Sequence, residues 1–200
     1  MNARVRQLCV IAASVLAASL GQTGLSRAQC VPSPEICDGI DNNCDGSIDE
    51  VRGTRWVGPG GIDGDNLCTD PGTPCATIAW AIKAACAGEA IQVFPGTYTE
   101  NVVVDKAVTI SSVDSALDTR LAGTGSGDVV TILAGAAVWN GIDVSGSPGA
   151  ACVRIGDVLH PGVRGVSVTN QGLYQCAVGI LLDSTGPTGD WNRLVGNDIR

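Results

Sequence analysis

The chain has 200 residues, with 12 lysines and arginines, 20 aspartates and glutamates and one histidine, so its formal net charge is −8. A chain this negative repels nucleic acid and anionic lipid surfaces. Composition therefore excludes a nucleic-acid partner.

Residues 1–28 have the three-part layout of a secretory signal peptide. Two early arginines form a basic start, 13 apolar residues follow at 8–20, and Ser26-Arg27-Ala28 offers a small-x-small cleavage site. So short an apolar run cannot span a membrane, which needs about 20 residues. We expect a secreted, periplasmic or cell-surface protein that is not inserted in a membrane after cleavage. Nine basic and 20 acidic residues would remain, a net charge of −11.

Eight cysteines follow residue 28, an even number that indicates disulfides in an exported chain. They are Cys30, Cys37, Cys44, Cys68, Cys75, Cys86, Cys152 and Cys176. Zinc is the alternative, but the chain has one histidine and no C-x-x-C pair. Many pairings are possible, and we expect Cys68 with Cys75 because a turn-rich segment lies between them.

Residues 29–52 are predicted to be an acidic, cysteine-rich module. Before Arg52 it contains no basic residue and six carboxylates, whose repulsion a bound cation would relieve. The segment 41–49 begins like a calcium loop, D-x-[DN]-x-[DN]-G, in which oxygens at alternate positions converge on one ion. The predicted metal ligands are Asp41, Asn43, Asp45, Ser47, Asp49 and Glu50.

This loop is not an EF-hand, because position 12 is Arg52 and helix-forming sequence is missing on both sides. Glu50 or Asp38 would have to complete a more compact site. Calcium is the expected cofactor, since copper and zinc favour imidazole and sulfur rather than carboxylate and amide oxygens. A disulfide-stapled acidic turn without an ion is the alternative.

The segment from Cys37 to Glu50 resembles the metal-binding repeat of bacterial surface proteins related to the copper-associated MopE family. It reads Cys37-Asp38-Gly39-Ile40-Asp41-Asn42-Asn43-Cys44-Asp45-Gly46-Ser47-Ile48-Asp49-Glu50. The resemblance implies metal binding at a cell surface. The family name points to copper, whereas these residues suit calcium.

Residues 53–200 are predicted to be part of an all-β, right-handed parallel β-helix. A short helix is expected over 77–86, followed by two strands around a Pro-Gly turn over 90–104. V-x-I units recur at 108–110, 130–132, 153–155 and 178–180, and a second series runs through 142–144, 166–168 and 197–199. Two such series indicate stacked coils, with the helix covering the first coil. A β-sandwich is the alternative.

The stretches 73–78 and 94–100, with their P-G-T-Y-x-E motif, are similar to the first coils of the pectin-lyase-like superfamily. The resemblance covers roughly residues 55–200 and implies a β-helix whose outward strand residues act on carbohydrate. Since Arg200 falls inside a strand, we expect the sequence to be the front part of a longer protein.

Strand parity directs Asp143, Ser167 and Asp198 outward in one predicted column. Asp143 and Asp198 would lie roughly 9–10 Å apart, near the upper limit for an inverting glycosidase pair. Polar outward residues are also what any solvated strand requires, so no catalytic residue is assigned. Arg154, Arg164 and Arg193 match a lyase base by residue type alone.

The favoured function is a non-catalytic secreted or cell-surface protein that uses the β-helix as a structural or binding module, with a polysaccharide or other cell-surface ligand as partner. The alternative is a polysaccharide lyase or glycoside hydrolase whose catalytic coils lie beyond residue 200. Copper capture is a third hypothesis, but it predicts histidine or methionine clusters that this chain does not contain.

Overall fold

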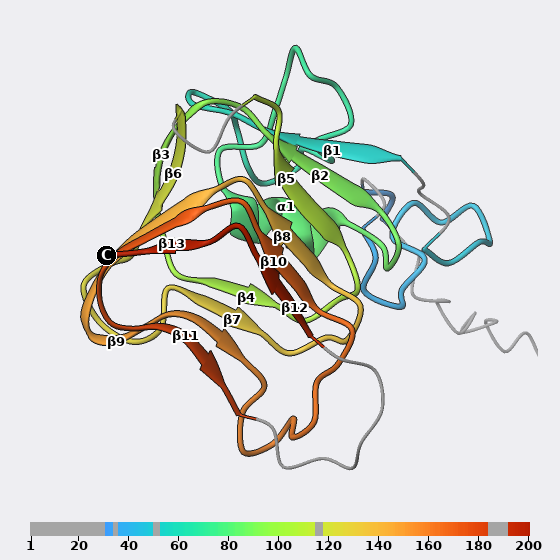
Figure 1. Ribbon diagram of the computed structural model, residues 1–200. Helices are drawn as coiled ribbons and strands as arrows, with labels where there is room; N and C mark the ends of the chain where they lie inside the picture. Colours follow the sequence, from blue (N-terminus) through green and yellow to red (C-terminus); the bar gives the residue numbers. More distant parts are fainter. Residues whose placement is uncertain (1–30, 34–35, 50–52, 115–117, 184–191) are drawn as a thin grey trace, which may run out of the picture.

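The computed structural model describes residues 31–33, 36–49, 53–114, 118–183 and 192–200. Within these ranges it contains one helix and 13 strands, and the paired strands are all parallel. They stack as successive turns of a β-solenoid (Figure 1), which confirms the predicted fold class. No helix in the described ranges is long and apolar enough to cross a membrane.

The first wall of the solenoid is a six-stranded sheet. Its strands, in order, are β1 (Thr54–Val57), β2 (Ala90–Val93), β5 (Thr109–Ser112), β8 (Val138–Asn140), β10 (Ser167–Thr169) and β12 (Arg193–Val195). Because side chains alternate between the two faces of a strand, every second residue points into the solenoid. The register stacks one inward row through Arg55, Ile91, Ile110, Trp139, Val168 and Leu194.

The second sheet has seven strands. They are β3 (Gly96–Thr99), β4 (Val102–Val104), β6 (Thr119–Ala122), β7 (Val130–Ile132), β9 (Asp143–Ile155), β11 (Gly172–Leu182) and β13 (Asp198–Ile199). The long strand β9 pairs with β6 through its first residues and with β7 through its last. Two short strands of the earlier coils therefore merge into one long strand in the later coils.

A two-residue corner that begins with a left-handed residue joins the first sheet to the second in three coils, before β9, β11 and β13. Its first residue is Gly141, Asn170 or Gly196, with φ of 65°, 56° and 68°. Glycine and asparagine adopt this left-handed conformation most readily. The corners are stacked, because Gly141 N donates to Thr169 O at 3.0 Å and Asn170 N donates to Val195 O at 3.1 Å.

The interior is mainly apolar, and it holds a buried ion pair at its amino-terminal end. Arg55 points inward from β1 and is fully buried; its Nε donates to Glu89 Oε2 at 2.8 Å and its Nη1 to Leu67 O at 2.7 Å. Each buried aliphatic side chain of the remaining core contributes about 1.5–3 kcal/mol. The charged pair is tolerated there because the two charges neutralise each other at contact distance.

Helix α1 (Ile78–Ala84) lies against β1, β2 and β4 at this end. Thr77 is its N-cap and accepts a hydrogen bond from Trp80 N at 3.1 Å. The carboxylate of Glu100 accepts from the first two N–H groups of the helix at 2.8 and 3.0 Å. The helix ends earlier than predicted, since the backbone is already extended at Ala85.

A disulfide-closed loop covers the free edge of β1. Cys75 N donates to Trp56 O at 2.9 Å, and Trp56 N donates to Cys68 O at 2.7 Å. Cys68 and Cys75 are disulfide-bonded, with their Cα atoms 5.1 Å apart, which confirms the expected pairing. The loop thus supplies partners to a strand edge that would otherwise attract other chains.

The register corrects the predicted V-x-I repeat. Val130 does pair with Val153, as expected. The unit 108–110, however, runs into β5 of the first sheet, and β4 takes its place beside β7. The last unit is displaced by two residues, so that Val153 pairs with Ile180, because β11 changes register in its middle.

The second predicted series is wrong for a related reason. Residues 142–144 lead into β9 of the second sheet, whereas 166–168 lie at β10 of the first. The partners of 143–144 and 198–199 are in fact residues 172–173, at the start of β11. The coils differ in length, so residues that are regularly spaced in the sequence can lie in different walls.

Candidate metal site

Residues 41–47 form a tight turn in which side-chain oxygens accept hydrogen bonds from the backbone. Asp41 Oδ1 accepts from Asp45 N at 3.2 Å, and its Oδ2 accepts from Gly46 N at 2.9 Å. Asn43 Oδ1 accepts from the same Asp45 N at 2.9 Å. Gly46 has a φ of 97°, which allows the sharp turn. Three predicted ligands, at positions 41, 43 and 45, are thereby brought to one turn.

Asp45 continues the same pattern. Its Oδ1 accepts from Ser47 N at 2.8 Å, and its Oδ2 accepts from Asn43 Nδ2 at 3.2 Å. The backbone N–H of Ser47 lowers the pKa of Asp45 below its usual value, because it stabilises the ionised carboxylate. The turn therefore keeps its negative charge at neutral pH.

Of the remaining predicted ligands, Ser47 belongs to the same turn through its N–H bond to Asp45, whereas Asp49 does not. Asp49 Oδ1 accepts a hydrogen bond from Gly39 N at 3.1 Å. In the part of the chain that the structure describes, no three His, Cys, Asp or Glu side chains are close enough together to hold a metal ion. Asp49 therefore does not complete a cluster with Asp41 and Asp45, and Glu50 lies outside the described residues.

The donor set of the turn fits a hard cation. It offers carboxylate and amide oxygens and no imidazole, which is the set that calcium prefers and copper does not. A carboxylate oxygen that accepts one N–H retains a second lone pair for an ion. Since calcium takes about six to eight oxygens, further ligands must come from the Ser47 carbonyl, Asp49, Glu50 or water.

Two contacts fasten this module, the blue segment of Figure 1, to the solenoid. The first is a disulfide between Cys37 and Cys86, whose Cα atoms are 5.0 Å apart. The second is the ammonium of Lys106, in the connection after β4. It donates to Cys37 O at 2.8 Å and to Lys83 O and Ala85 O at 2.9 Å each.

Sequence reasoning did not identify Lys106 as part of this region. Burial lowers the pKa of Lys106, and the negative charges of Asp105, Asp49 and Asp38 act in the opposite direction. The sequence offered one signal for Lys106, which is the rarity of lysine. The chain has only two lysines, and Lys106 is the one that falls between two predicted strands. The Cys37–Cys86 pairing carried no comparable signal.

The outward column of the solenoid also differs from the prediction. Gly172, not Ser167, lies between Asp143 and Asp198. Asp143 is 9% exposed rather than open to solvent; its Oδ1 accepts from Gly172 N at 2.6 Å, and both residues line a pocket of about 340 Å³. Asp198 Oδ2 pairs with Arg200 Nη2 at 2.6 Å. The two carboxylates are therefore committed to other partners.

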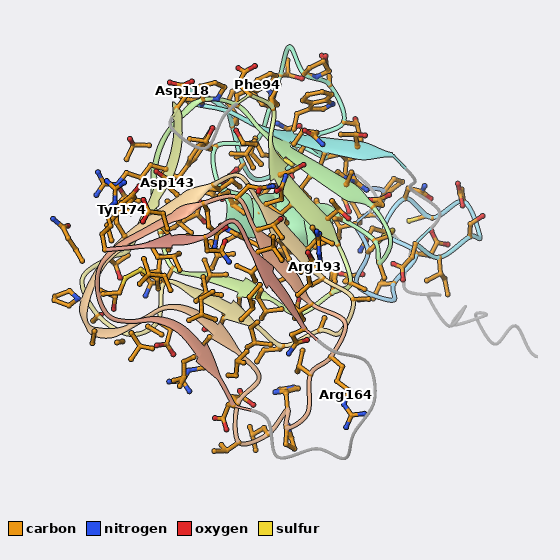
Figure 2. The ribbon with its side chains drawn as sticks, viewed as in Figure 1. Phe94, Asp118, Asp143, Arg164, Tyr174 and Arg193 are labelled. Carbon is orange, nitrogen blue, oxygen red and sulfur yellow. A yellow bond between two sulfur atoms is a disulfide. The ribbon has the colours of Figure 1, made fainter. Side chains whose placement is uncertain are left out.

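The arginines considered for a lyase do not join these carboxylates. Arg154 forms ion pairs with Asp128 and with Asp183, the latter at 3.6 Å. The hydrogen bond to Asp128 raises the pKa of Arg154, so the guanidinium is held further from acting as a base. Figure 2 shows Arg164 and Arg193 well away from Asp143, so they do not form one site with it.

Comparison with known proteins gives one match, and it falls on the acidic module. The family model Cu-binding_MopE, described as "Putative metal-binding motif", matches residues 33–50. No curated protein and no solved structure matches the chain. The match includes every described residue of the 41–47 turn, and a metal-binding motif carried by a β-solenoid fits a structural or binding module.

Proposed function

We propose that this chain is an exported protein in which a calcium-ordered acidic loop is carried at one end of a rigid β-solenoid. The observation that carries the proposal is the turn at 41–47, where Asp41, Asn43 and Asp45 present side-chain oxygens around a single left-handed glycine. The family match at 33–50 supports metal binding, and the oxygen-only donor set favours calcium over copper.

The loop has to rearrange only locally to bind the ion. Asp41 and Asp45 are already ordered by backbone N–H groups, so little conformational freedom remains to be lost on binding. Asp49 would exchange its hydrogen bond with Gly39 for the ion, or Glu50 would close the site in its place.

The solenoid would then act as a spacer or a binding face for a polysaccharide or another cell-surface ligand. Its disulfides suit an oxidising destination outside the cytoplasm. Kinship with the pectin-lyase-like superfamily is part of the proposal, supported by the parallel coils and by the helix that covers the first of them.

Calorimetric titration of the oxidised chain with calcium tests the proposal. We expect one calcium ion per chain, and no binding by an Asp41→Ala/Asp45→Ala variant. The matched control is Asp65→Ala/Asp114→Ala, which removes two exposed negative charges elsewhere and should bind as the parent does. Absence of binding by the parent would leave the loop as a stapled acidic turn. Tighter binding of copper than calcium would correct the metal.

A further inference from the structure

We propose that the acidic module is a calcium-dependent clasp on the first coil, with Lys106 as the positioning residue that transmits binding to helix α1. This rests on the proposed calcium site and adds what the ion would do there. When calcium holds the module, α1 and the solenoid end beneath it open less often.

Lys106 joins three parts of the chain at one atom. An ammonium group has three N–H donors, and Lys106 Nζ uses all of them on the carbonyls of Cys37, Lys83 and Ala85. Lys83 and Ala85 belong to the end of α1, where carbonyls lack helical partners and favour a positive charge. Cys37 belongs to the acidic module. Lys106 therefore cannot satisfy the helix end and the module independently.

Both ends of the loop lie at the same place on the solenoid, and one of them is covalently bonded there. Cys37 begins the loop and is bonded to Cys86, just after α1. At the other end of the loop, the Asp49 carbonyl lies 3.5 Å from Cys86 Sγ, and its Oδ1 accepts from Gly39 N. Opening of the helix end thus pulls on the loop through Cys37 and separates Asp49 from Cys86.

The coupling follows from this closed arrangement. An ion that fixes 41–47 also fixes the separation of Cys37 and Asp49, and with it the position of the Cys37 carbonyl that Lys106 holds. If α1 can open only after the loop releases its ion, calcium at one hundred times its dissociation constant slows that opening about one hundredfold.

Hydrogen exchange of the oxidised full chain, followed by mass spectrometry in calcium chloride and in chelator, tests the clasp. In the parent, we expect calcium to slow exchange of the α1 peptide up to about one hundredfold. In Lys106→Met, which keeps the aliphatic stem, calcium should still bind but leave α1 exchange nearly unchanged. By linkage, the variant should also bind calcium more weakly.

Lys83→Met is the matched control, because it removes the other lysine of the chain, which lies in the last turn of α1. Lys83 lies 4.7 Å from the centre of the Trp80 ring and is exposed, so its loss leaves the clasp intact. This variant should keep the full calcium effect. Equal slowing in Lys106→Met and the parent would overturn the clasp.

A second variant separates the clasp from a general loss of stability. Cys37→Ser/Cys86→Ser cuts the covalent tie but leaves the 41–47 turn and Lys106 in place, so we expect calcium binding with a reduced effect on α1. If the parent binds no calcium at all, the metal site itself fails and the clasp with it. If calcium binds and α1 does not respond in the parent, only the clasp is wrong.

Discussion

The first and the last of the described coils bury their inward residues very differently. Arg55, at the amino-terminal end of the inward row, is 0% exposed, whereas Leu194, at the other end of that row, is 37% exposed. The second sheet behaves alike, since Leu173 is 1% exposed and its neighbour Ile199 is 61% exposed. A charged side chain is thus better buried at one end than an aliphatic one at the other.

In this fold, the burial of an inward residue depends on whether another element covers its coil, and not on the polarity of the residue. Arg55 is enclosed by the loop that carries Leu67 on the outer side of β1, by Glu89 just before β2 and by α1, which contacts β1. Among the described residues, no strand pairs with the outer edge of β12 or β13. Each coil therefore depends on a neighbour on both sides, as expected for a one-dimensional stack.

The largest expected effect is on the free energy of unfolding, when a substitution in the middle of the inward row is compared with one at its exposed end. Trp139→Ala removes a fully buried ring between two coils and should lower the free energy of unfolding by about 3–5 kcal/mol. Leu194→Ala should cost less than about 1 kcal/mol, since part of that side chain already contacts water. Urea unfolding followed by circular dichroism measures both. Equal losses would show that the last coil is as well covered as the middle.

The disulfides of the amino-terminal end should differ in the stability they provide. Cys37–Cys86 closes a sequence separation of 49 residues and Cys68–Cys75 one of 7. On chain entropy, replacing the first pair by serine should cost about 4 kcal/mol and the second about 2 kcal/mol. Unfolding midpoints of the two double variants give the comparison. The reverse order would mean that the short loop contributes chiefly by covering the β1 edge.

The smallest expected effect is on the titration of Tyr98, a residue of β3 in the first coils. Burial, with a further contribution from Glu100, raises the pKa of Tyr98 to about 12, and its hydroxyl donates to Phe94 O at 2.8 Å. Since the folded value is raised above the unfolded value of about 10, this stability is present below pH 10 and is lost as the pH rises through 12. Ultraviolet absorbance of tyrosinate should show a late step that Tyr98→Phe abolishes. A late step that persists in the Tyr98→Phe variant would contradict this assignment.

The fold was predictable because its signals are local. Alternating apolar residues define single strands, and the turn-rich segment between Cys68 and Cys75 brings those two cysteines together. The stacking order was not predictable, because Val108 and Val130 carry the same V-x-I pattern but lie in different walls. A spacing of roughly one coil does not reveal which wall a strand joins when coil lengths vary.

The candidate metal site likewise has one part that the sequence predicts and one part that it does not. The turn at Asp41, Asn43 and Asp45 follows from residue types two positions apart, and the structure brings these three together. The contact of Lys106 with Cys37 joins residues 69 positions apart, and no local pattern encodes it. Its position depends on where the chain emerges from β4, which is a property of the assembled coils.

The repeated corner at Gly141, Asn170 and Gly196 has a consequence for how this chain tolerates changes in length. Each corner has two residues, although β9 has 13 residues and β11 has 11. In these three coils variation in length is therefore accommodated within the second wall and the return to the first sheet, whereas six residues separate β5 from β6 at the corresponding junction of an earlier coil. Insertions along those segments would bulge outward and leave the cross-section of the solenoid unchanged, whereas one added residue at a corner would invert every side chain that follows it until the next turn.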